Sequence, residues 1–163
     1  MKILIDTKTE LSNANYFVGM ELKLSEDKSC HITVTWLGKI TMEKLEDLCQ
    51  DLSNVTKLPL LIKFNNFDTL GKPEDIAKGR GLLVRKCELL DKKYQSQLLE
   101  FHKKWYYHEE GEAEERKTNV KYHVTVSPGK ISKEVLEQLS EVSCTDIYIK
   151  QVGGQRVASF SGK

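Results

Sequence analysis

Two similar stretches of this chain each place a threonine two residues after a histidine. They read HITVTW from His31 and HVTVSP from His123, in a chain with only four histidines. Side chains at positions i and i+2 of a β-strand point to the same face, so each stretch would present an imidazole beside a hydroxyl. His31, Thr33, His123 and Thr125 are therefore the candidate catalytic residues.

Two such pairs suit the cleavage of a phosphodiester. One imidazole would take a proton from an attacking hydroxyl or water while the other gives a proton to the leaving oxygen, since imidazole titrates near neutral pH. The threonine hydroxyls would donate hydrogen bonds to phosphate oxygens as negative charge develops there. The arrangement requires neither a metal nor a cofactor, and no carboxylate cluster that would bind a metal is evident in the sequence.

The competing interpretation is structural, because a single His-x-Thr sequence usually does no more than form a strand. The flanking sequences favour a function, since GKITMEKLEDL follows the first motif and GKISKEVLEQL follows the second. A glycine turn, a hydroxyl residue suited to an N-cap (Thr41 or Ser132) and the apolar spacing of a helix all recur. The repeat predicts two lobes with approximate internal symmetry and equivalent strands facing a shared cleft.

The elements that would position these residues follow from hydrophobic spacing and turn residues. Strands are predicted at 16–24 and 30–37, joined as a hairpin through the polar turn at 25–29. The apolar residues Met42, Leu45, Leu48, Cys49 and Leu52 predict a helix after Thr41. The remaining predictions are strand 58–67, loop 68–75, strand 80–89, helix 90–107, charged loop 109–117, strand 120–127 ended by Pro128–Gly129, helix 132–142, and strands 147–151 and 155–160 joined through Gly153–Gly154.

Composition predicts a soluble single domain spanning 1–163. Lys and Arg number 25 against 24 Asp and Glu, which argues against a long nucleic-acid footprint, so we expect no DNA partner. The four cysteines are widely spaced, which predicts reduced, buried thiols. The acidic residues that soon follow the N-terminus and the absence of a long apolar run predict neither a signal peptide nor a membrane span. We therefore expect a cytoplasmic monomer.

The two motifs resemble the paired H-x-[ST] signature of the 2H phosphoesterase superfamily, whose members are also called LigT-like phosphodiesterases. The sequence WLGK after the first motif is similar to the aromatic-Leu-Gly continuation common in that family. The resemblance implies an α+β bilobal fold, with an antiparallel sheet and flanking helices in each lobe around a central cleft. It also implies metal-independent catalysis by His31, Thr33, His123 and Thr125. Tyr122 stands where family members often place proline, and its side chain should face away from the cleft.

Family resemblance and near-neutral charge together favour a small nucleotide substrate. A minimal single-domain chain is similar to the viral and phage members that destroy cyclic dinucleotide or oligonucleotide messengers of host immunity, which would place it in the host cytoplasm. The alternatives are a phosphodiesterase for 2′,3′-cyclic phosphate ends of RNA or for 2′-5′ oligoadenylates. From another class, a non-catalytic nucleotide- or RNA-binding module stays open.

Aromatic and basic residues outside the motifs supply the candidate substrate contacts. Tyr16 and Tyr107 could stack a base, and Lys39 and Arg80 could meet a phosphate. Tyr106 and Trp36 are further aromatic candidates, but strict alternation places Trp36 on the face of Ile32 and Val34, which predicts a core position.

Overall fold

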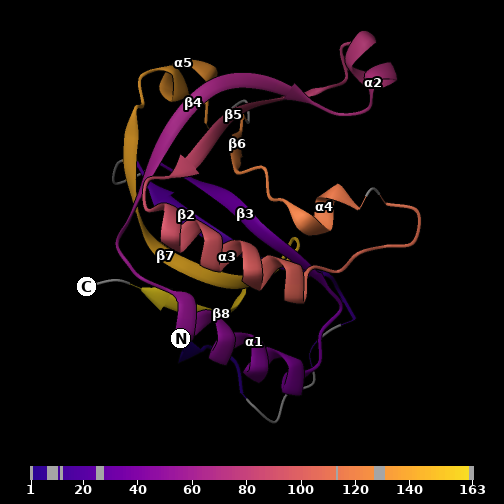
Figure 1. Cartoon of the computed structure of the whole chain (residues 1–163), viewed down its shortest axis with the longest axis vertical. Helices are drawn as coiled ribbons and strands as arrows, with labels where there is room; N and C mark the ends of the chain where they lie inside the picture. The colour runs from indigo at the N-terminus through magenta and orange to yellow at the C-terminus, as the bar shows by residue number, and fades with distance from the viewer. Residues whose placement is uncertain are drawn as a thin grey trace.

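The computed structural model describes residues 2–6, 11, 13–24, 28–112, 114–126 and 131–161. Within these residues, eight strands form one sheet whose pairings are all antiparallel, and five helices accompany it (Figure 1). This architecture confirms the α+β class expected from the sequence. No helix in the described part of the chain is long and apolar enough to cross a membrane.

The sheet has two parts that share one strand. In the first, which we call the β3 half, β2 (Tyr16–Lys23) pairs with β3 (Ser29–Gly38) and with β7 (Glu141–Gln151). The other edge of β7 pairs with β8 (Arg156–Ser161), which in turn pairs with β1 (Lys2–Ile3). The confirmed β2–β3 and β7–β8 hairpins are therefore the frame of this half.

The second part, which we call the β6 half, continues from the start of β7. β4 (Leu60–Leu70) pairs with the first four residues of β7 and with β5 (Leu82–Leu89), and β5 pairs with β6 (His123–Thr125). Cys144 of β7 pairs with both Leu22 and Leu60, so it marks the position where the two halves meet. β6 also lies next to β3, although the described residues of these two strands form no backbone ladder.

Two long helices cover the apolar face of the β3 half. α3 (Lys92–Trp105) lies against β3, and α1 (Met42–Val55) packs on α3 (Figure 1). The Thr41 hydroxyl accepts a hydrogen bond from the Lys44 amide at 3.1 Å, which confirms the predicted N-cap. Each helix buries one stripe in the common core: Leu45, Leu48, Cys49 and Leu52 on α1, and Tyr94, Leu98 and Phe101 on α3.

All four cysteines lie in this apolar environment, and none forms a disulfide. Burial raises the pKa of Cys30, Cys87 and Cys144 to about 12 and that of Cys49 to about 11. The predicted reduced, buried thiols are therefore what the structure contains.

Three predicted segments differ from the structure, two because they contain a short helix or the end of a strand and one because its strand is shorter. The loop at 68–75 is partly the end of β4 and partly α2 (Pro73–Ala77), and the charged loop at 109–117 leads into α4 (Glu115–Thr118). Within the described part of the strand expected at 120–127, strand structure is limited to β6, and residue 127 lies outside the described residues. β1 was not predicted, and the turn residues 25–27 and Pro128–Gly129 lie outside the described residues.

The helix predicted to reach about residue 142 is wrong in length. α5 (Lys133–Glu137) ends early, since Glu141–Cys144 pair with β4 instead. The guanidinium of Arg85 donates hydrogen bonds to the backbone carbonyls of Leu136 and Leu139, the latter at 2.6 Å. These bonds tie Arg85 of β5 to the last turn of α5 and to the residues that follow it, where the Leu136 carbonyl also accepts from the Leu139 amide.

Candidate active site

His31 and Thr33 lie on the open face of β3, as alternation predicts. His31 is exposed and Thr33 is half-buried, whereas the neighbouring Ile32 and Val34 are buried in the core. The register places Glu21 of β2 opposite His31 and Gly19 opposite Thr33. The first predicted pair of imidazole and hydroxyl therefore shares one accessible face.

A β-bulge then changes the alternation of β3. Val18 pairs with Thr35 but Gly19 pairs with Thr33, so Val34 is the extra residue and both Val34 and Thr35 are buried. The Phe17 ring lies 6.1 Å from the His31 ring and 5.4 Å from the Trp36 ring. Trp36 thus emerges on the face of His31 and is 47% exposed, so the prediction that it lies in the core is wrong.

His31 lines a pocket of about 400 Å³ that is also lined by Arg156, whose side chain makes several contacts. We call it the His31 pocket. Arg156 lies over the Tyr148 ring, with its guanidinium carbon 4.1 Å from the ring centroid. Its nitrogens contact the carboxylates of Glu21 at 2.9 Å and Asp146 at 3.4 Å, so the guanidinium is fixed beside His31.

Tyr148 reaches this position because residue 19 is a glycine. A Cβ at Gly19 would lie 2.8 Å from the Tyr148 hydroxyl, closer than side-chain atoms approach. Burial raises the pKa of Tyr148 to about 12, so its hydroxyl stays protonated at neutral pH and can donate a hydrogen bond. Gly19 and Tyr148 therefore place a phenol next to the Thr33 position, which is opposite Gly19 in the register.

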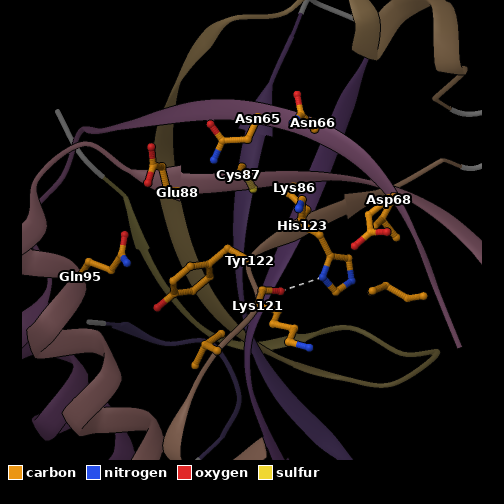
Figure 2. A pocket seen from close by; sticks show the side chains of 13 residues that line it. Asn65, Asn66, Asp68, Lys86, Cys87, Glu88, Gln95, Lys121, Tyr122 and His123 are labelled. Carbon is orange, nitrogen blue, oxygen red and sulfur yellow. Dashed lines mark hydrogen bonds between the residues drawn. The ribbon is translucent and has the colours of Figure 1, made fainter. Parts of the chain in front are cut away.

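His123 has a defined ring orientation on β6. Its Nδ1 lies 2.7 Å from the Lys121 carbonyl oxygen, and a carbonyl can only accept, so Nδ1–H is the donor (Figure 2). Nε2 of the neutral ring then carries the lone pair. Val124 is buried while His123 and Thr125 are half-buried, as expected for a pair facing away from the core.

His123 lines a second pocket, of about 440 Å³, which we call the His123 pocket (Figure 2). Lys86 of β5 is the register partner of His123, and Lys121 and Asp68 also line the pocket. Two ammonium groups and one imidazole thus share this pocket with two carboxylates, those of Asp68 and Glu88.

The structure brings the two motif strands together but assigns the two imidazoles to different pockets. β3 and β6 lie next to each other, yet His31 lines the first of these two pockets and His123 the second, and neither pocket is lined by both rings. A single cleft flanked by both rings therefore stays a prediction.

The predicted substrate-binding residues are scattered. Tyr16 is 1% exposed and belongs to the hydrophobic core, so it presents no face to a ligand and that prediction is wrong. Lys39 is exposed just after β3. Arg80 lies in the turn after α2, at the far end of the β4–β5 hairpin, and lines none of the described pockets (Figure 1). Tyr107 is exposed and lines a third pocket beside Trp36.

Several polar residues near the motifs were not predicted from the sequence. Glu21 could have been found by counting across the β2–β3 hairpin, since it is opposite His31. Tyr148, Arg156 and Lys86 required the pairing of strands far apart in the chain, which no local pattern gives.

A third histidine supports β3 from the side of α3. The buried His102 has Nε2 2.7 Å from the Arg116 carbonyl oxygen, so Nε2–H donates and Nδ1 accepts from the Thr35 hydroxyl at 3.1 Å. Burial is the main cause that lowers the pKa of His102, so its neutral ring links α4 to β3.

Comparisons with known proteins assign no family. No protein-family model matches the chain, and no curated protein sequence matches it. Among the described residues, no three His, Cys, Asp or Glu side chains are grouped to hold a metal ion.

Proposed function

We propose that this chain is a metal-independent phosphodiesterase of the 2H type, in which the β3 half and the β6 half are the two lobes. The observation that carries the proposal is that β3 and β6 lie next to each other, and each has its histidine and threonine off the core face. Ile32 and Val124, which separate the histidine from the threonine in each motif, are buried. Each motif therefore follows the alternation of a β-strand, with its histidine and threonine on the face away from the core.

In the proposed reaction, His123 acts as the general base. Its Nδ1–H bond to the Lys121 carbonyl leaves Nε2 with a lone pair, which takes the proton from the attacking hydroxyl or water. The oxygen then attacks phosphorus as the bond to the leaving oxygen breaks, and His31 gives that oxygen a proton. Thr33 and Thr125 donate hydrogen bonds to the non-bridging oxygens.

The proposed substrate is a short nucleotide, most simply a cyclic dinucleotide or cyclic oligonucleotide messenger. The support is the near-neutral net charge of +1 and the size of the pockets, about 400 and 440 Å³, which suit a small ligand rather than a nucleic-acid duplex. Phosphodiesters in RNA 2′,3′-cyclic phosphate ends and 2′-5′ oligoadenylates are the alternative substrates with the same chemistry.

A panel assay tests the proposal. The purified chain is incubated with cyclic dinucleotides, 2′-5′ oligoadenylates and cyclic-phosphate-ended RNA, with and without a chelator, and products are resolved by chromatography. We expect turnover of at least one class that survives the chelator. Loss of turnover with chelator would reject the metal-independent mechanism, and saturable binding of a panel member with no turnover at any pH would favour the non-catalytic binding module.

A further inference from the structure

The exposed Trp36 belongs to a third pocket, of about 300 Å³, at the end of β3. We call it the Trp36 pocket. Trp36 and Tyr107 line it, and Tyr107 is fixed relative to Trp36 because its amide donates to the Trp36 carbonyl at 2.9 Å. The Tyr107 ring also packs on Gly38, where an added Cβ would lie 2.8 Å from the ring. These two contacts with the backbone of β3 therefore hold the exposed Tyr107 beside the exposed Trp36.

The polar residues of the pocket distinguish a base from a phosphate. Glu109, Glu112 and Arg116 line it together with Asn15, so two carboxylates face one guanidinium. Such a balance repels a phosphate, while carboxylate and amide groups can accept hydrogen bonds from the amino and ring N–H groups of a base. A flat ligand with such donors on its edge, and an aromatic face to stack, fits this combination.

The path from His31 to this pocket runs along one face of the sheet. Phe17 lies between the two rings, 6.1 Å from His31 and 5.4 Å from Trp36. A phosphate at His31 and a base at Trp36 would therefore both lie beside the Phe17 ring, on the same face of the sheet. The bulge at Val34 is what turns Trp36 to this face.

We propose that the Trp36 pocket binds a nucleobase of the substrate, by stacking on Trp36 and by hydrogen bonds from the base edge, while the scissile phosphate lies at His31. The position of the phosphate rests on the proposed phosphodiesterase function. The position of the base rests on the pocket itself. Because every base has an aromatic face, the stacking contact sets affinity for nucleotides as a class.

Binding of adenosine 5′-monophosphate, compared with ribose 5-phosphate, tests the pocket without turnover. In a Trp105→Phe background, Trp36 is the only tryptophan, so its fluorescence reports contact directly. We expect adenosine 5′-monophosphate to quench the fluorescence and ribose 5-phosphate to have no effect. Calorimetry on the wild-type chain and on Trp36→Ala should give a roughly tenfold weaker Kd for the variant, with Trp36→Tyr close to wild type. Leu61→Ala, at a comparably exposed strand residue, is the control and should bind as wild type.

The outcomes separate the pocket from the phosphodiesterase proposal. If the chain turns over a substrate but Trp36→Ala leaves its KM and the Kd for adenosine 5′-monophosphate unchanged in a folded protein, the base site is wrong and the enzyme stands. If the chain turns over nothing, yet adenosine 5′-monophosphate quenches Trp36 and ribose 5-phosphate does not, the base site stands and the enzyme proposal is rejected. Equal quenching by both probes overturns the base site.

Discussion

The same His-x-Thr pattern is supported in two different ways in β3 and in β6. β3 has ten residues, eight of which pair with β2, whereas β6 has three residues at the edge of its half of the sheet. The position of His31 comes from a long ladder and the Phe17 ring, while the ring of His123 is held by one hydrogen bond to Lys121. The comparison teaches that alternation alone can present an imidazole and a hydroxyl, and that the surroundings then decide what each ring can do.

Removal of either imidazole should have the largest effect if both strands serve one reaction. We expect His31→Ala and His123→Ala each to lower kcat by about 10²- to 10⁴-fold, because each removes a general acid or base. Single-turnover assays on the best substrate of the panel measure the loss. His108→Ala, at a histidine outside both motifs, is the control and should retain activity.

The double variant His31→Ala/His123→Ala sharpens this comparison. Two groups that act in one step are not additive, so the double variant should be little slower than the worse single variant. A single variant with near-wild-type turnover would show that only one of the two strands is catalytic.

Removal of either threonine hydroxyl should lower kcat less than removal of an imidazole, and by a similar factor at Thr33 and Thr125. Thr33→Val and Thr125→Val each remove one hydroxyl donor while keeping the β-branched shape, and we expect kcat to fall roughly 10²-fold with little change in KM. Steady-state kinetics of both variants give the ratio of their kcat values. A loss at Thr33 alone would mean that β6 positions its histidine but not its hydroxyl on the phosphate.

Gly19→Ala tests the packing of the Tyr148 ring on Gly19, a support described for β3 and not for β6. The added Cβ would lie 2.8 Å from the Tyr148 hydroxyl, so the buried ring must shift, and we expect the free energy of unfolding to fall by about 1–3 kcal/mol. Chemical denaturation measures it. In a Tyr148→Ala background the same substitution should cost much less, since the clashing ring is gone. Equal costs in both backgrounds would locate the strain elsewhere.

The smallest effect concerns His102, which bonds Thr35 of β3 and has no counterpart beside β6 among the described residues. Burial lowers the folded pKa below the ordinary value of 6.5, so as the pH falls through about 6.5 the unfolded chain binds a proton that the folded chain does not. The contribution to stability is therefore complete above this pH and is lost as the pH decreases toward the folded pKa. We expect Tm to fall between pH 7.5 and pH 5, and His102→Gln to reduce the slope. An unchanged slope would assign the dependence to other groups.

The sequence was sufficient where a local rule decides the outcome. Period-two alternation placed His31 with Thr33, and His123 with Thr125, away from the core, and the hydroxyl before each helix predicted both N-caps. Alternation failed at Trp36 because a bulge depends on the partner strand, which a single strand does not reveal. Tyr16 failed for a related reason, since β2 lies between β3 and β7 and its apolar face is fully covered.

The distant residues of the site could not be predicted. Arg156 and Tyr148 join Glu21 only because β7 and β8 return to the hairpin from more than a hundred residues away. α5 was predicted too long because its helical pattern continues into residues that β4 recruits for pairing. Long-range pairing overrides local preference in both cases.

β7 has a consequence for the order in which the protein assembles. It pairs with β2, β8 and β4, so neither half of the sheet has its full set of neighbours until residues 141–151 have left the ribosome. Before that moment the β2–β3 and β4–β5 hairpins lack the strand that joins them, and the strand edges that pair with β7 have no partner strand. Nascent chains that end before β7 should therefore depend on chaperones, and folding should be slow, because closure joins residues far apart in the chain.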